Sequence, residues 1–98
     1  MRLRMQVKNY QVLNYNNPKD MHTVTIYSSP TCHFCHMAKD FFKKNNIQYT
    51  DRDVATDPTA GPEAIQKSGQ MGVPVIDIDG KIVAGFNEPQ LRELLEIK

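Results

Sequence analysis

The spacing of apolar residues predicts a strand, a helix and a second strand between residues 22 and 54. Thr23 to Tyr27 is a short run rich in β-branched and aromatic residues, and two serines and a proline follow it, a pattern typical of a buried strand. After Cys32, apolar residues recur at helical spacing on one side while lysines and an aspartate occupy the other, which predicts an amphipathic helix. Residues 47–54 have the composition of a second strand.

The rest of the pattern predicts a helix, a hairpin and a last helix. Residues 57–69 contain prolines near the expected first turn of a short helix and a glycine just past its end. Two alternating apolar runs flank Asp79-Gly80, a dipeptide that favours a type I′ turn. The last helix is expected to begin at Asn87, whose side chain can cap it, and Gln90 can complete a capping box.

In this order the elements make a βαβ unit followed by a ββα unit. Right-handed crossovers and short connections then build a four-stranded mixed sheet flanked by helices, which is an α/β fold. Residues 1–21 stand outside the pattern, and we expect an N-terminal arm there that is either flexible or an extra edge strand. Residues 22–98 are expected to form the single folded domain.

Composition and charge narrow the class of protein. A chain of 98 residues with 40% hydrophobic and 23% charged residues is typical of one small globular domain, and its net charge of +1 gives no reason to expect nucleic acid or an anionic membrane as partner. No apolar run of about 18 residues is present, so no membrane span is predicted. Two early arginines are not followed by an apolar stretch of about 7–15 residues, so no secretory signal is predicted and the expected location is cytoplasmic.

The stretch CHFCH at residues 32–36 is compatible with a c-type haem attachment, half of a zinc site or a redox dithiol. Haem attachment needs an export route, which the N-terminus does not predict. Structural zinc usually takes four Cys or His ligands, and the two cysteines and three histidines of this chain fit no closed spacing. A redox dithiol without metal is therefore favoured, and intracellular disulfides are mostly transient and catalytic.

The predicted elements give the two cysteines different roles. Cys32 lies where a strand ends and a helix begins, so free N–H groups and the positive end of the helix dipole favour a thiolate there. Cys35 follows one helical turn later on the same face. Cys32 is therefore the expected nucleophile and Cys35 the resolving thiol.

Three motifs, in order and at matching spacing, resemble the glutaredoxin family of the thioredoxin-fold superfamily over roughly residues 22–98. They are IYSSPTCHFC around the cysteines, GQMGVPVI before the third strand and Gly85-Phe86 before the last helix. Within this family, the motifs most resemble those of short bacterial glutaredoxin-like proteins. The resemblance implies a thioredoxin-like fold of the glutaredoxin type and a monomeric thiol–disulfide oxidoreductase, active in electron transport and cell redox homeostasis, whose substrates are disulfide-bearing proteins or glutathione-mixed disulfides.

The resemblance also implies particular contacts around the cysteines. Val73-Pro74 is expected to be cis and to lie against the cysteine pair, leaving the N–H and C=O of Val73 for an extended substrate backbone. The implied surface for substrate or glutathione consists of Thr31, Phe34, Gln70, Val73, Pro74, Gly85, Phe86 and Asn87.

The chain departs from the family pattern at two charged glutathione contacts. Ser29 occupies the position of a lysine and Asn87 that of an aspartate, while Gln70 is retained. Charge-assisted hydrogen bonds contribute about 1.5–3 kcal/mol each, so weaker binding of glutathione is expected. No tightly bound cofactor is expected, and the reductant is either glutathione as co-substrate or thioredoxin reductase.

Other interpretations concern the neighbours of the cysteines. A protonated His33 would stabilise the Cys32 thiolate and make the disulfide more oxidising, so His33 is the expected tuning residue, whereas His36 is interpreted as an exposed first-turn residue. A carboxylate near Cys35, from Asp51 or Asp53, could relay a proton. An iron–sulfur cluster shared by two chains would need glutathione as ligand, which the lost charges disfavour. A non-enzymatic binding module is the remaining alternative, and the presence of both cysteines disfavours it.

Overall fold

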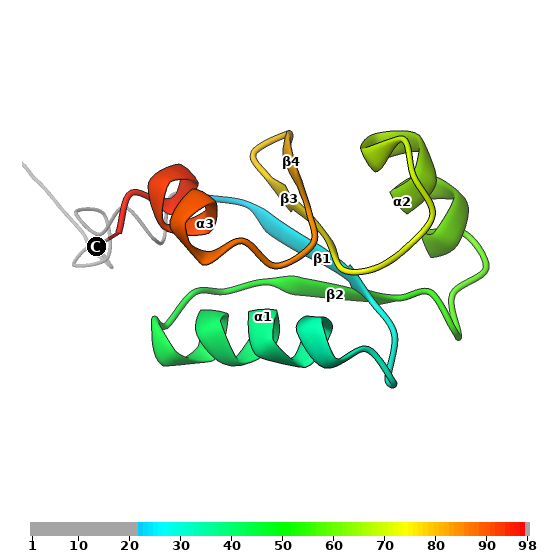
Figure 1. Cartoon of the computed structure of the whole chain (residues 1–98), viewed down its shortest axis with the longest axis horizontal. Helices are drawn as coiled ribbons and strands as arrows, with labels where there is room; N and C mark the ends of the chain where they lie inside the picture. The colour runs from blue at the N-terminus through cyan, green and yellow to red at the C-terminus, as the bar shows by residue number, and fades with distance from the viewer. Residues whose placement is uncertain (1–21, 98) are drawn as a thin grey trace, which may run out of the picture.

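The computed structural model describes residues 22–97, in which the elements follow the predicted order (Figure 1). No helix among these residues is long and apolar enough to cross a membrane. The strands form a mixed sheet in the order β2-β1-β3-β4, with β1 parallel to β2 and antiparallel to β3. The expectations for residues 1–21 lie outside the described part of the chain. The elements are β1 (Val24–Ser28), α1 (His33–Lys44), β2 (Thr50–Asp53), α2 (Ala60–Ser68), β3 (Val75–Ile78), β4 (Lys81–Ala84) and α3 (Glu88–Leu95).

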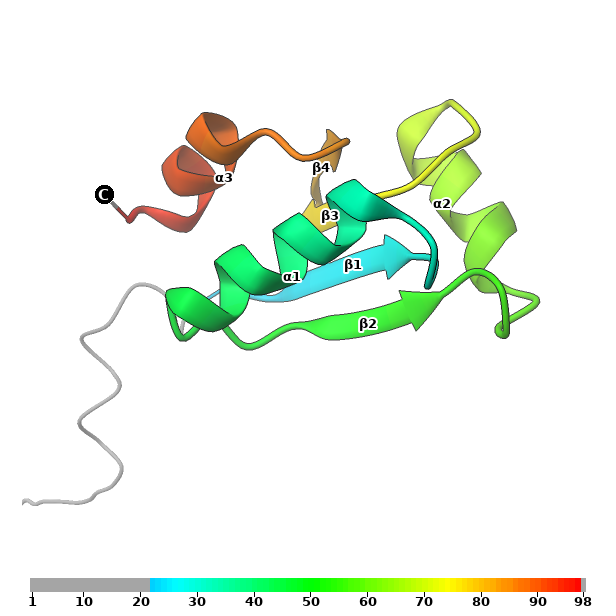
Figure 2. The same ribbon diagram turned by 60° about the horizontal axis from the view of Figure 1, so that its bottom comes forward.

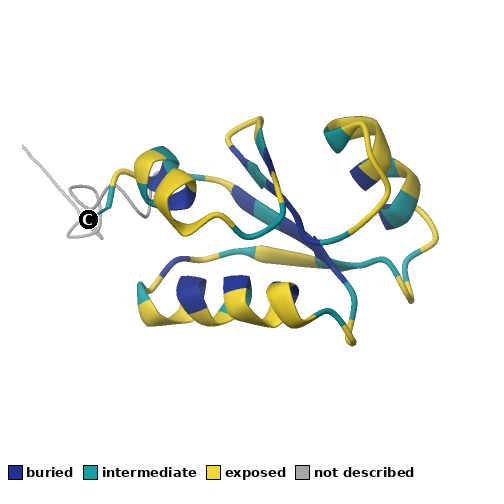
Figure 3. Cartoon of the chain, viewed as in Figure 1, coloured by how far each residue is buried: buried dark blue, intermediate teal, exposed yellow. Residues whose placement is uncertain are grey.

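Helices cover both faces of the sheet because β1 carries apolar side chains on both of its sides. Ile26 belongs to the core cluster beneath α1 and α3, whereas its neighbour Tyr27 belongs to the cluster beneath α2. The buried positions of α1 and α2 accordingly lie on the sides that face the strands (Figure 3), and Figure 2 shows α1 alongside β1 and β2. Ala60 and Ala64 supply the buried face of α2, and their small side chains let this helix lie close to the sheet.

Strand β2 is shorter than the strand predicted over residues 47–54. Ile47 is buried in the core beneath α1, and its N–H donates to the Phe42 carbonyl at 2.8 Å, so the chain is still attached to the end of the helix there. At the other end, the Val54 N–H donates to the Ser28 carbonyl at 2.8 Å and a turn follows directly. Core packing at one end and a turn at the other leave only the residues from Thr50 to Asp53 paired with β1.

The predicted turn between β3 and β4 is confirmed, whereas the predicted capping box of α3 forms only in part. Asp79 and Gly80 both have positive φ, 55° and 90°, as a type I′ turn requires. Asn87 caps α3, accepting the Gln90 N–H at 3.2 Å. The Gln90 side chain, however, bonds the Asn87 side-chain amide at 3.5 Å instead of its backbone N–H, so the reciprocal half of the box is absent.

A polar cluster fastens α2 to the sheet. The buried Tyr27 donates its hydroxyl hydrogen to the Glu63 carboxylate of α2, which also accepts from Arg52 of β2 at 3.2 Å. Lys67 of α2 bridges to Asp77 of β3 at 2.7 Å and lies over the Tyr27 ring, 5.3 Å from its centroid. The helix that faces the cis-proline loop is thus held by hydrogen bonds and ion pairs as well as by its two alanines.

Replacing Tyr27 with phenylalanine is expected to make the free energy of unfolding less dependent on pH below about pH 4. The Tyr27 hydroxyl, and then Arg52, hold the pKa of Glu63 below its ordinary value, and Thr59 with Arg52 lowers the pKa of Asp57 to about 2. Carboxyls with lowered pKa values stabilise the fold above their unfolded pKa of about 4, and this stability is lost as the pH falls. Urea titrations at several pH values should show a shallower decline in the free energy of unfolding below about pH 4 for Tyr27→Phe than for the wild type. Equal slopes would contradict this prediction.

Candidate functional site

Cys32 is the N-cap of α1, so its sulfur occupies the place that a serine or aspartate oxygen usually takes. The residue is extended, with φ −90° and ψ 112°, and its Sγ accepts the Cys35 N–H at 3.1 Å. Its carbonyl accepts the His36 N–H at 3.2 Å as the first bond of the helix. The sulfur therefore lies at the positive end of the α1 dipole with a donor aimed at it, which stabilises negative charge on that atom.

Cys35 lies in an opposite environment, one turn further along α1. Its side chain is 0% exposed, whereas Cys32 is only half-buried. Burial, reinforced by the Cys32 sulfur, raises the pKa of Cys35 to about 12, although the Ser29 backbone and the Lys39 charge act in the opposite direction. The pair thus consists of an accessible sulfur at a helix N-terminus and a buried, protonated thiol beside it.

The loop before β3 places its backbone against Cys32. The Val73-Pro74 bond is cis, as the resemblance implies. The Cys32 thiol donates to the Val73 carbonyl at 3.6 Å, so this carbonyl is occupied while Cys32 is protonated. Among the described residues the Val73 N–H has no partner. A Cys32 thiolate has no hydrogen to donate, so ionisation leaves both polar groups of Val73 available to a bound chain.

Some of the residues expected to bind glutathione come together and others do not. A cavity of about 250 Å³ is lined by Gln70, Val73, Pro74 and Gly85, together with Met71, Gly72, Val75 and Ala84. The Gly85 N–H donates to the Pro74 carbonyl at 2.8 Å, which holds the β4 end beside the cis-proline loop. Thr31 and Phe34 are exposed beside Cys32. Asn87 is exposed, and its side chain caps α3.

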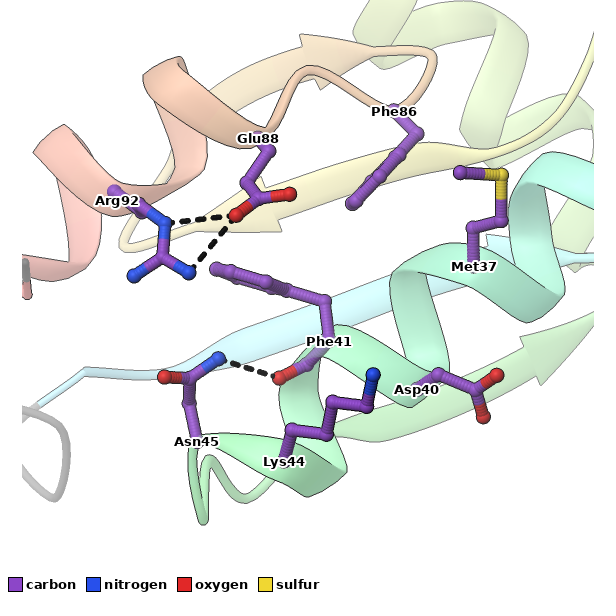
Figure 4. A pocket seen from close by; sticks show the side chains of 8 residues that line it. All are labelled: Met37, Asp40, Phe41, Lys44, Asn45, Phe86, Glu88 and Arg92. Carbon is purple, nitrogen blue, oxygen red and sulfur yellow. Dashed lines mark hydrogen bonds and ion pairs between the residues drawn. The ribbon is translucent and has the colours of Figure 1, made fainter.

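Phe86 points away from the cis-proline cavity and into a different one. Its ring lies 6.0 Å from the Phe41 ring, in a cavity of about 410 Å³ between α1 and α3 (Figure 4). In this second cavity Arg92 bonds Glu88 at 2.9 Å and lies over the Phe41 ring. Phe86 therefore packs α3 against α1, and its contact with glutathione stays a prediction.

The histidines beside the cysteines differ in their contacts. His36 is exposed, as expected, but its Nε2 bonds the Pro30 carbonyl at 2.9 Å and so fixes the loop before Cys32. His33 is exposed, and its ring meets the Phe34 ring edge-on at 5.6 Å. Residues 22–97 contain no group of three or more His, Cys, Asp or Glu side chains arranged to hold a metal ion.

A chain of polar side chains beneath α1, from the buried Ser28 to the exposed Asp51 and the half-buried Lys39, is the part of the site that the motifs did not identify. Lys39, one turn after Cys35, bridges to Asp51 at 2.6 Å, and the fully buried Ser28 donates to the same carboxylate at 2.6 Å. Asp53, the other candidate proton relay, instead accepts the Ala55 N–H at 2.8 Å in the turn after β2. The i,i+4 spacing of Cys35 and Lys39 is the sequence signal that could have revealed the pair.

Replacing Lys39 with methionine is expected to slow the attack of Cys35 on a mixed disulfide several-fold. Lys39 opposes the rise in the Cys35 pKa, and its removal also leaves the Asp51 negative charge without its cation. Both changes reduce the fraction of Cys35 thiolate. The decay of a preformed Cys32 mixed disulfide, followed by quenched-flow mass spectrometry, measures the step. Lys43→Met, an exposed change of equal charge on the same helix, is the control, and equal decay rates in the two variants would refute the prediction.

Comparisons with known proteins find similar sequences and structures. The Glutaredoxin family model matches residues 24–83. An uncharacterized glutaredoxin-like 8.6 kDa protein of the rubredoxin operon of Clostridium pasteurianum is 44% identical over 73 residues, covering 74% of this chain and 97% of that protein.

Among solved structures, a variant of the thioredoxin-like protein BC3987 superposes with a TM-score of 0.74 at 34% identity, covering 78% of this chain and 97% of that one. The glutaredoxin grx-1 from Archaeoglobus fulgidus superposes with a TM-score of 0.70 at 25% identity, covering 80% and 90% of the two chains. The similarity thus includes β1, the cysteines and the cis-proline loop.

Proposed function

Because this chain belongs to the glutaredoxin family, we propose that it is a thiol–disulfide oxidoreductase that uses Cys32 and Cys35 to reduce disulfides. The observation that carries the proposal is the asymmetry of the two sulfurs. Cys32 is accessible and accepts an N–H at the start of α1, whereas Cys35 is fully buried with its pKa raised by burial to about 12. One sulfur is poised to attack, and the other stays protonated until it is needed.

In the first step the Cys32 thiolate attacks one sulfur of the substrate disulfide. A bond forms between Cys32 Sγ and that sulfur, the substrate S–S bond breaks, and the other substrate sulfur leaves as a thiolate that takes a proton from water. The helix N-terminus and the Cys35 N–H, at 3.1 Å, stabilise the attacking anion. The substrate backbone pairs with the N–H and C=O of Val73, a contact that is independent of the substrate sequence.

In the second step Cys35 releases the reduced substrate. Cys35 loses its proton to water, and its thiolate forms a bond with Cys32 Sγ. The mixed-disulfide bond between Cys32 and the substrate breaks, and the substrate leaves as a thiolate that takes a proton from water. Two electrons have then passed from the dithiol to the substrate. Lys39, close enough to lower the pKa of Cys35, favours the ionised form in this step.

The reductant that restores the dithiol is either two molecules of glutathione or a flavoprotein thioredoxin reductase. One cavity is lined by Gln70, Val73, Pro74 and Gly85, the uncharged residues expected to contact glutathione, and this supports glutathione as the reductant. The exposed Asn87 and the half-buried Ser29 supply neither the anion nor the cation that would bind the charged ends of glutathione. We therefore propose that thioredoxin reductase reduces the Cys32–Cys35 disulfide faster than glutathione does.

The proposal is tested by reducing the oxidised protein with each donor separately. The Cys32–Cys35 disulfide is formed first, and glutathione or thioredoxin reductase with NADPH is then supplied while free thiols are counted. Faster appearance of both thiols with the reductase supports the reductase as donor, and faster appearance with glutathione assigns that role to glutathione. Reduction by neither donor would refute the oxidoreductase function as proposed.

A further inference from the structure

An apolar cavity adjoins Cys32 on the side of the cis-proline loop that faces α2. Its volume is about 360 Å³, and its walls come from α2, the residues after β1 and β2, and the loop before β3. Five of its eight lining residues are apolar, and the remaining three are one serine and two glycines, so no charged side chain lines it. The apolar residues are Val54, Ala64, Ile65, Met71 and Val73.

This cavity lies beside the proposed reacting sulfur, because two of its lining residues contact Cys32. Val73 lines it, and the Val73 carbonyl is the atom 3.6 Å from Cys32 Sγ. Ser29 also lines it, and its carbonyl accepts the Cys32 N–H at 3.2 Å. Each residue of an extended chain spans about 3.3 Å, so a side chain one or two positions from the reacting cysteine reaches the cavity.

Two exposed apolar side chains lie on the wall of this cavity, and a third lies next to the cysteines. Ile65 is 40% exposed and Met71 is 84% exposed on the wall, and Phe34, which precedes Cys35 in the first turn of α1, is 56% exposed. Met37, the other large hydrophobic residue exposed within residues 22–97, lines the cavity between α1 and α3. Isolated exposed apolar residues are ordinary, but a group of them beside a cavity indicates a binding surface.

We propose that this cavity is a specificity site that takes an apolar side chain of a polypeptide substrate, one or two residues from its reacting cysteine. The inference rests on the proposed function and names its substrate class. An apolar side chain gains by leaving water in such a cavity, whereas an ionised carboxylate would lose its hydration without a partner. The terminal carboxylate of glutathione therefore does not suit the cavity, and a protein disulfide with an apolar neighbour does.

A small set of disulfide peptides tests the site. The peptides differ only at the two positions on either side of one cysteine, which carry either leucine or aspartate, and kcat/KM is measured with the reduced full chain. At one of these positions leucine is expected to be favoured over aspartate by about tenfold or more, the effect of burying one apolar side chain. Equal kcat/KM values at every position would overturn the specificity site while leaving the oxidoreductase intact. Reduction of no peptide at all would overturn both.

Two variants connect the preference to the cavity. Gly61 lines the cavity in the first turn of α2, and apart from its chain neighbours a Cβ there meets no atom within 4 Å, so Gly61→Leu places a side chain in the cavity. It is expected to remove the preference for leucine, whereas Gln66→Leu, an exposed change on the same helix, is expected to keep it. Ile65→Asp is expected to shift the preference toward a lysine peptide. An unchanged leucine preference in both Gly61→Leu and Ile65→Asp would overturn the proposal.

Discussion

Replacing Cys32 with serine is expected to abolish disulfide reduction, whereas replacing Cys35 with serine is expected to stop the reaction after its first step and accumulate a mixed disulfide. Cys32 is the accessible sulfur at the N-terminus of α1, so no other group can make the first attack. Loss of a nucleophile typically costs on the order of a thousandfold or more in rate. Cys35 is fully buried and acts only on the intermediate, so its loss leaves the first bond intact.

Intact-mass measurements distinguish the two variants. After exposure to a disulfide peptide, Cys35→Ser should carry one peptide linked to Cys32, and added dithiol should release it. Cys32→Ser should carry none, because the burial that raises the pKa of Cys35 to about 12 keeps that sulfur both protonated and inaccessible. A variant lacking both cysteines is the matched control. A peptide linked to Cys35 in the Cys32→Ser protein would reverse the assigned roles.

The order of the elements could be predicted because each depends on local signals. The apolar periodicity of α1, the turn at Asp79-Gly80 and the cap at Asn87 all act within a few residues, and the structure has each of them. The place of Cys32 at a helix N-terminus followed from the same kind of signal. The different roles of Cys32 and Cys35 could therefore be predicted before any tertiary contact was known.

Features that depend on contacts between distant elements could not be predicted in this way. Lys39 and Asp51 are far apart in sequence, and the parallel pairing of β1 with β2 brings Asp51 beneath α1. The side on which the Phe86 ring packs could not be predicted either, because an aromatic residue before a helix can pack on either side of that helix. Here Phe41 of α1 offers a ring at 6.0 Å, so Phe86 joins the core between the helices.

The double substitution Ser29→Lys with Asn87→Asp is expected to increase the rate of reduction by glutathione by about 30- to 100-fold. Each change restores a charge for one end of glutathione, and a charge-assisted hydrogen bond contributes about 1.5–3 kcal/mol, where 1.4 kcal/mol corresponds to tenfold. Asn87 is exposed and Ser29 only half-buried, so water screens both new charges and each contributes about 1–1.4 kcal/mol, just below that range.

Neither substitution is expected to damage the fold. Aspartate caps a helix as well as asparagine does and adds a favourable charge at the N-terminus of α3. Ser29 bonds Cys32 through its backbone carbonyl, which lysine retains. Oxidised protein is mixed with glutathione and thiol appearance is followed, with Gln48→Lys plus Gln66→Glu, the same charges at exposed positions elsewhere, as the matched control. Equal rates in the two double variants would show that the missing charges do not limit the rate at which glutathione reduces the protein.

The same double variant is expected to lose its preference for leucine peptides while its reduction by glutathione becomes faster. Ser29 lines the apolar cavity between α2 and the cis-proline loop, so a lysine there places a cation at a site without charged side chains. A leucine next to the substrate cysteine would then compete with a hydrated ammonium group for the cavity. Measured with the leucine and aspartate peptides, Ser29→Lys alone should reduce or reverse the preference for leucine, whereas Asn87→Asp alone should leave it unchanged. The opposite pattern would mean that glutathione and polypeptide substrates do not share this part of the surface.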